Sequence, residues 1–191
     1  MARRRKQDAT IGWLLLLALP VLIFQAMAEH PVISAVIVLA ILIVARSAWK
    51  ARKDSQAESL RRMLGASPEE LDLMSGSEFE QWICAVLENE GISAENIRNS
   101  GDFGIDVIAE VEGNRIGIQA KRYSSGVGND AVQQVIAGSD YHNCSFAAVV
   151  TQSHFTRAAR EQASRAHLPL ALIDRTGLSR LSDRLRKLVS R

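Results

Sequence analysis

Three polar residues in the second half of the chain, Asp106, Gln119 and Lys121, have side chains that together could hold a divalent cation and hydrolyse a phosphoester. A carboxylate and an amide oxygen are ligands that suit Mg²⁺. A lysine beside the cation can orient a water and offset charge at a phosphoryl transition state. The alternative interpretation is a surface ion pair between Asp106 and Lys121, which contributes a few tenths of a kcal/mol at most.

A predicted β-hairpin brings these side chains together. Residues 105–111 and 115–121 are predicted strands around Gly113-Asn114, a two-residue hairpin signal. With those two residues as the loop, Asp106 lies directly opposite Lys121, and Gln119 is diagonal to Asp106. Opposed residues share a face of the sheet, as do alternate residues of one strand, so one patch is expected to contain all three.

The segment 67–191 alternates predicted helices and strands. Ser67-Pro68 is a helix start, and Ser77 to Glu80 is a predicted capping box for a second helix, which Gly91 ends. Further strands are predicted over 92–98, 146–151 and 170–173, and further helices over 130–142, 156–167 and 178–189. This order predicts an α/β fold, with a mixed sheet flanked by helices.

Two linked motifs in this segment resemble the signature of the Mrr-type restriction endonuclease family. They are the run from Gly101 to Asp106 and the run from Gln119 to Tyr123. That family belongs to the PD-(D/E)xK nuclease superfamily, in a branch where glutamine replaces the second acidic residue. The run from Ser77 to Glu80 resembles the family's first-helix motif, and the run from Ser153 to Thr156 its later strand-to-helix segment. The resemblance covers about residues 70–190 and implies a restriction-endonuclease-like fold.

The resemblance also implies a role for each matching residue. Asp106 would be the central ligand of a Mg²⁺ or Mn²⁺ ion. Gln119 and the carbonyl of Ala120 would complete the protein ligands, and Lys121 would position the attacking water. Glu80 would reach the metal from the first helix, directly or through water.

Two acidic residues near these motifs have competing interpretations. Glu80 could instead make the reciprocal capping contact to Ser77. For Asp102, a role in capping the glycine turn is favoured over a catalytic role.

The charge of the chain changes sign along its length. Lysine and arginine total 23 and aspartate and glutamate 21, a formal net charge of +2. Residues 63–120 contain 2 basic and 12 acidic side chains, whereas residues 121–191 contain 11 basic and 5 acidic. This polarity favours a polyanionic partner beside an acidic pocket. The two cysteines have no CxxC spacing, which argues against a disulfide scaffold and an ordinary zinc site.

DNA is the expected partner, and five residues are candidate contacts to it. Arg122 and Tyr123 follow the second hairpin strand, and Ser124 begins a Gly/Ser loop whose backbone N–H groups could reach a phosphate. Arg157 and Arg160 recur on one predicted helix; the alternative is an ordinary solvated helix face.

The first 66 residues predict attachment to a lipid bilayer. Residues 1–10 form a basic tail, 11–49 a transmembrane hairpin of two helices, and 50–66 a charged stalk. The first apolar stretch, 11–28, would be about 27 Å long as a helix, close to the hydrocarbon thickness. The second, 32–45, is short and is extended by the residues up to Trp49.

Basic residues flank the hairpin on both sides, so the positive-inside bias places both termini and the 67–191 domain in the cytoplasm, at the inner membrane of a bacterium. A cleaved signal peptide is the alternative, with Ala26 to Ala28 as the cleavage site.

The leading hypothesis is therefore a membrane-tethered, Mg²⁺-dependent DNA endonuclease that restricts foreign DNA. The resemblance implies a homodimer as one way to cut both strands. A non-catalytic, membrane-anchored module that binds or senses DNA is the first alternative, and a scaffold that assembles through its hairpin is the second. A membrane hairpin stands where the family's founding architecture has a recognition module, so the sequence assigns no DNA specificity.

Overall fold

The computed structural model describes residues 30–97 and 103–190 of the 191-residue chain. The chain divides into two compact units, Met1–Ala57 and Glu58–Arg191. The predicted first membrane helix, the signal-peptide alternative and Asp102 all lie outside the described residues.

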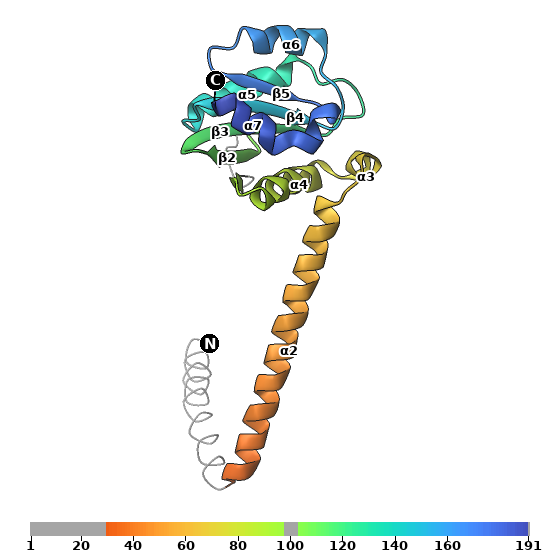
Figure 1. The fold of residues 1–191 in the computed structure, drawn as a ribbon, viewed down its shortest axis with the longest axis vertical. Helices are drawn as coiled ribbons and strands as arrows, with labels where there is room; N and C mark the ends of the chain where they lie inside the picture. Colours follow the sequence, from red (N-terminus) through yellow and green to blue (C-terminus); the bar gives the residue numbers. More distant parts are fainter. Residues whose placement is uncertain (1–29, 98–102, 191) are drawn as a thin grey trace, which may run out of the picture. The chain divides into compact units, whose positions relative to one another are not determined.

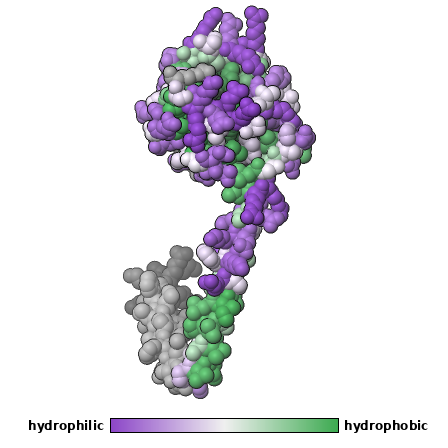
Figure 2. All heavy atoms as spheres, viewed as in Figure 1, coloured by the Kyte–Doolittle hydropathy of each residue, from purple (hydrophilic) through white to green (hydrophobic). Residues whose placement is uncertain are grey.

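Helix α2, Pro31–Leu64, is one continuous helix of 34 residues, about 51 Å long. It contains the second predicted membrane segment and the predicted stalk up to Leu64, with no break between them. Apolar side chains surround its first half and polar side chains its second half (Figure 2). It is the one helix in the described part of the chain that is long and apolar enough to cross a membrane.

A mixed five-stranded sheet forms the centre of the second unit (Figure 1). Its strands lie in sequence order, and β1 pairs antiparallel with β2 and β2 with β3, whereas β3, β4 and β5 are parallel. The strands are β1 Ser93–Asn96, β2 Val107–Val111, β3 Asn114–Lys121, β4 Phe146–Thr151 and β5 Leu170–Ile173. The last two match the predicted ranges.

Helices cover both faces of the sheet. One hydrophobic cluster joins the strands to α4 (Gly76–Asn89) and α7 (Leu181–Val189), and the other joins them to α5 (Asn129–Tyr141) and α6 (Arg157–Ser164). The short helices are α3, Pro68–Leu73, and the 3₁₀ helix η1, Arg175–Arg180, which replaces the first turn of the predicted last helix. The predicted mixed sheet flanked by helices is confirmed.

The alternation of side chains along β3 decides which face carries the chemistry. Ile116 and Ile118 are buried in the cluster with α4 and α7. Gln119 is paired with Val149 of β4, which packs in the cluster with α5 and α6. Gln119 and Lys121 therefore lie on the face that α5 covers.

The predicted hairpin register is wrong by two residues. The loop is Glu112-Gly113 rather than Gly113-Asn114, because both Glu112 (φ +51°) and Gly113 (φ +77°) adopt the positive φ of a type I′ turn. Val107 is paired with Ile118, so Asp106 comes opposite Gln119 and not Lys121. A shift of two residues leaves every side chain on its predicted face.

The predicted capping box of the second helix is also wrong. Helix α4 is capped by Ser75, whose hydroxyl accepts from the N–H of Glu78 at 3.2 Å, while the Glu78 carboxylate accepts from the N–H of Ser75 at 2.7 Å. Two overlapping Ser-x-x-Glu motifs compete here, and the earlier one prevails. Glu80 is consequently not a capping residue. The predicted start at Ser67-Pro68 is confirmed, since Ser67 caps α3.

Candidate active site

An open pocket of about 530 Å³ lies between the hairpin and helix α5. We call it the Asp106 pocket. Its lining comes from the loop before β2, the end of β3 and one side of α5, namely Phe103, Gly104, Asp106, Gln119, Lys121, Gln133, Gln134 and Ala137. The three residues from which the sequence analysis began therefore line a single pocket.

Asp106 is fixed at the point where the hairpin strands separate. Its backbone N–H donates to the carbonyl of Ile118 at 2.9 Å. Further along β3, the backbone N–H of Ala120 donates to Oδ2 of Asp106 at 2.7 Å. The carboxylate thus accepts the hydrogen bond that a backbone carbonyl of a longer β2 would accept. The side-chain amide of Gln119 donates to the same oxygen. Gln119 is only 4% exposed, so the carboxylate is held against a buried group.

Lys121 is the last residue of β3 and is half-buried. It shares the face of Gln119, and its cationic side chain lines the pocket that contains the Asp106 carboxylate. The arrangement places one carboxylate, one amide and one ammonium group around a space open to solvent.

Helix α5 contributes two residues that the sequence analysis did not identify, Gln133 and Gln134. Both are exposed and lie beside the buried positions Val132 and Val135. In the sequence, only their position at the edge of the apolar stripe of α5 could have pointed to them. The packing of α5 on β3 is needed to show which pocket they line.

Glu80 lies on the second turn of α4 and is half-buried. Its carboxylate accepts from the side-chain amide of Asn96 at 3.2 Å, at the end of β1. The next residue, Ile97, donates its backbone N–H to the carbonyl of Asp106 at 3.1 Å. The end of β1 thus connects the Glu80 carboxylate to the backbone of Asp106.

The predicted DNA-contact residues lie in two places. Arg122, Tyr123 and Ser124 line a second pocket, of about 580 Å³, at the carboxyl ends of β3, β4 and β5. Arg157 and Arg160 are exposed on α6. Arg160 lies 3.4 Å from the carboxylate of Asp174 and over the ring of Phe155.

The second pocket, which we call the Arg122 pocket, contains two carboxylates whose pKa values are lowered from the ordinary value. The hydrogen bond from Arg175 lowers the pKa of Asp72. Burial alone would raise the pKa of Asp174, but hydrogen bonds from Thr176 and Arg160 outweigh it and hold that pKa below its ordinary value.

The Asp106 pocket offers oxygen donors for a hard cation. No group of three or more His, Cys, Asp and Glu side chains suited to a metal occurs among the described residues. A strand residue directs its N–H and C=O toward the same neighbour, so the carbonyl of Ala120 faces the Asp106 side. A flip of the Gln119 amide presents its oxygen in place of its nitrogen. With one carboxylate, one amide and one carbonyl, the donors fit a cation that retains several waters, as Mg²⁺ does.

Comparisons with known proteins give one family and two structures. The model of the family Mrr_cat, described as a restriction endonuclease, matches residues 71–182, which is 112 of the 191 residues. No curated protein matches the chain. The crystal structure of a protein of unknown function, AF1548, is 21% identical with a TM-score of 0.43, over 50% of this chain and 56% of that one. The MspJI restriction endonuclease in complex with a 27-mer oligonucleotide is 22% identical with a TM-score of 0.39, over 56% of this chain and 27% of that one.

Proposed function

Because this chain belongs to the Mrr_cat restriction endonuclease family, we propose that residues 67–191 form a Mg²⁺- or Mn²⁺-dependent nuclease domain that hydrolyses phosphodiester bonds of DNA. The observation that carries this proposal is the convergence of Asp106, Gln119 and Lys121 on one pocket. These residue types can hold a divalent cation and orient a water for phosphodiester hydrolysis, and they come from the two motifs that resemble the family signature.

Each of these residues has a distinct task. The backbone N–H of Ala120 keeps the Asp106 carboxylate in one orientation, and the Gln119 amide N–H adds to this until its flip presents an oxygen to the cation. Gln119 and the Ala120 carbonyl would add oxygen ligands beside it. A divalent cation in the pocket would supply a water of lowered pKa and polarise the phosphoryl oxygens. Lys121 would orient that water and offset the negative charge that grows on the phosphoryl oxygens.

Glu80 would act on this site from outside the strand pair. Its link through Asn96 to the backbone of Asp106 favours an indirect role. Glu80 would either contact the cation through a water or hold the end of β1 in place. Its capping alternative is removed, since Ser75 and Glu78 form the capping box. The Glu80 carboxylate would supply negative charge that Gln119 lacks.

Phosphate contacts would dominate DNA binding. Arg122, Tyr123 and Ser124 follow directly on Lys121, so a strand bound at the Asp106 pocket would pass over them; Arg157 and Arg160 on α6 would extend this surface. Binding of this kind falls steeply with salt, because each neutralised phosphate releases counterions.

Helix α2 would tether the nuclease domain to a lipid bilayer. Its apolar half, from Val32 to Val44, contains no buried residue, and every position except the half-buried Ser34 is exposed. Together with the basic flanks in the sequence, this supports a cytoplasmic nuclease domain on a bacterial inner membrane. Restriction of foreign DNA by a homodimer is the biological setting that we propose.

The test is cleavage of supercoiled plasmid by the full chain in detergent, with Mg²⁺, Mn²⁺ or EDTA. Asp106→Asn keeps an oxygen that can accept from Ala120, so the fold should remain while activity falls on the order of 10³-fold. Lys121→Met should do the same. Glu110→Gln is the matched control, an exposed carboxylate on β2 outside the pocket, and should cut at the wild-type rate. Equal cleavage by the Asp106 and Glu110 variants would show that the activity arises elsewhere.

One observation favours the alternative of a non-catalytic module that binds DNA. The Asp106 pocket has a single carboxylate among its lining residues. Retention of DNA without cleavage across Mg²⁺ and Mn²⁺ would support this alternative.

A further inference from the structure

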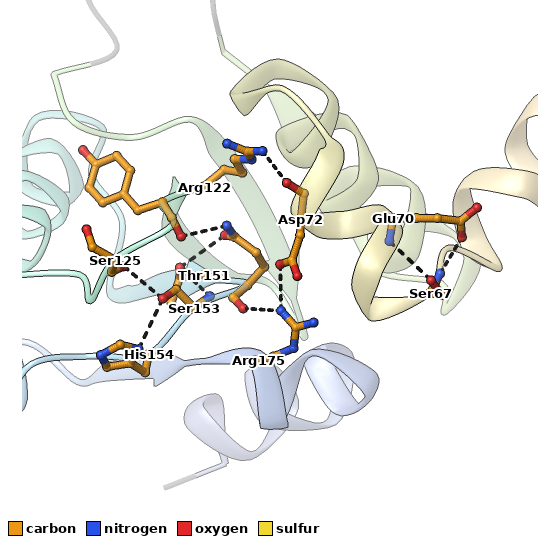
Figure 3. Close-up of polar contacts among 11 residues, drawn as sticks. Ser67, Glu70, Asp72, Arg122, Ser125, Thr151, Ser153, His154 and Arg175 are labelled. Atoms are coloured by element: carbon orange, nitrogen blue, oxygen red, sulfur yellow. Dashed lines mark hydrogen bonds and ion pairs between the residues drawn. The ribbon is translucent and has the colours of Figure 1, made fainter.

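Two arginines in the Arg122 pocket converge on one residue of helix α3 (Figure 3). Arg175 donates to the carboxylate of Asp72 at 2.7 Å. Arg122 donates to the backbone carbonyl of the same Asp72, which lies in the last turn of α3, where carbonyls have no partner within the helix. Asp72 therefore receives both guanidinium groups.

The pocket around these arginines is held in shape by hydrogen bonds between its three loops. Gln152, which is 3% exposed, donates to the carbonyl of Tyr123 at 2.9 Å. Ser153 donates to the carbonyl of Ser125 at 2.9 Å. Arg175 also donates to the carbonyl of Gln152, at 3.3 Å. The loops that follow β3, β4 and β5 thus form one connected lining, and Figure 3 shows their side chains facing one another.

The contact to Asp72 is open to a competing anion. The side chains of Arg175 and Asp72 are 40% and 46% exposed. The Nε of Arg122 is buried and makes no hydrogen bond to any described residue. An ion pair with this exposure contributes little to stability, whereas a guanidinium binds a phosphate through two parallel hydrogen bonds.

The Arg122 pocket is adjacent to the Asp106 pocket along one strand. Lys121 lines the first and Arg122 the second, and consecutive Cα atoms are about 3.8 Å apart. Phosphates of one DNA strand follow each other at about 3.4 Å of helix rise. Because consecutive strand residues point to opposite faces, a bound strand would pass around the end of β3 to place one phosphate in the Asp106 pocket and another at Arg122 and Arg175.

We infer that Arg122 and Arg175 form a phosphate site for the bound DNA strand, and that Asp72 occupies this site as a built-in competitor when no DNA is present. The inference rests on the proposed function in taking DNA as the ligand. It adds a specific regulatory contact: DNA binding must displace the Asp72 carboxylate from Arg175 and the Asp72 backbone carbonyl from Arg122.

Fluorescence anisotropy of the full chain in detergent, with a labelled 20-bp duplex and Ca²⁺ or EDTA in place of Mg²⁺, measures this competition. Asp72→Asn should bind the duplex about threefold to tenfold more tightly. Arg175→Gln and Arg122→Gln should each bind about tenfold more weakly, with the slope of log K against log salt reduced by about one. Arg62→Gln, which removes an arginine paired with Glu58 on α2, is the matched control and should leave both quantities unchanged.

Each outcome of this experiment decides the inference. Unchanged affinity in Asp72→Asn would overturn it. This result can be interpreted even if the arginine variants fail to fold. Thermal stabilisation by inorganic phosphate, with duplex affinity unaffected by every variant, would identify a free-phosphate site instead and also overturn it. A chain that binds DNA through both arginines but never cleaves it would remove the nuclease proposal and leave this inference standing.

Discussion

Substitution of Gly104 by alanine tests the packing that forms the Asp106 pocket. Gly104 has a φ of +92°, a conformation that alanine rarely adopts. A Cβ at this position would lie 2.5 Å from the carbonyl oxygen of Gln134 and 2.8 Å from its Cβ. The first of these atoms belongs to the backbone of α5, so the helix or the loop must move.

The size of the effect follows from two separate costs. The left-handed backbone costs alanine about 1–2 kcal/mol. Crowding against α5 should add about 1–3 kcal/mol. Gly113→Ala isolates the first cost, since Gly113 has a φ of +77° and a Cβ there would have no neighbour within 4 Å. At about 4 °C per kcal/mol, the melting temperature of Gly104→Ala should lie about 4–12 °C below that of Gly113→Ala.

Differential scanning calorimetry of both variants, with plasmid cleavage measured well below both melting temperatures, is the assay. A shift of about 1 Å between Asp106 and Gln134 should reduce cleavage on the order of 10²-fold in Gly104→Ala, and Gly113→Ala should cut normally. If the two variants lose equal stability, the close approach of the loop to α5 is refuted. If Gly104→Ala loses stability but cuts normally, α5 has no part in the site.

Four further experiments test other parts of the domain. Ser75→Ala should lower the unfolding free energy by about 1 kcal/mol in urea titrations, because it removes the cap of α4. The hydrogen bond from the backbone N–H of Ser75 lowers the pKa of Glu78 from 4.5. The stabilisation by Glu78 is therefore complete above pH 4.5 and is lost as the pH falls through the lowered pKa. Glu78→Gln should make the free energy of unfolding less dependent on pH below 4.5. Burial raises the pKa of Cys84 to about 11, so its alkylation at pH 8 should be roughly 100-fold slower in the folded chain than in urea. Ser139→Ala should leave stability unchanged or raise it, since the buried Ser139 hydroxyl makes no hydrogen bond to any described residue.

The elements of the fold were predictable because their apolar patterns are local. The predicted strands 146–151 and 170–173 coincide with β4 and β5, which are short apolar runs between turn residues. The family signature also lies in local motifs, so the convergence of Asp106, Gln119 and Lys121 could be anticipated, whereas the α5 side of the pocket could not. The strand ranges and the motif residues depend on neighbours in sequence and not on packing.

Errors arose where two local signals of equal strength overlap. Gly113 can be the first or the second residue of a hairpin turn, and sequence preference favoured Gly-Asn over the observed Glu-Gly. Ser75 and Ser77 each precede a glutamate by three residues. In both cases the rest of the fold selects the alternative, through strand pairing for the hairpin and the buried face of the helix for α4.

The Arg122 pocket was not predictable as a pocket. Its residues come from four separated segments, and Asp72 and Arg175 are 103 positions apart. Parallel pairing of β3, β4 and β5 brings the loops that follow them to one edge of the sheet. Sequence motifs identified Arg122 but gave no indication that an acidic residue of α3 would contact it.

Small residues explain why the polar residues of α5 reach the hairpin. A Cβ on Gly117 of β3 would lie 2.4 Å from Cδ1 of Ile105, and a Cβ on Gly138 of α5 would lie 2.7 Å from Cγ1 of the same side chain. Ile105 is fully buried between them and directly precedes Asp106. The strand and the helix therefore close on the residue next to the candidate metal ligand, and this packing adds to the hydrogen bonds that position Asp106. A larger residue at either glycine would separate α5 from β3 and move Gln134 away from the carboxylate, with no change to any residue that lines the pocket.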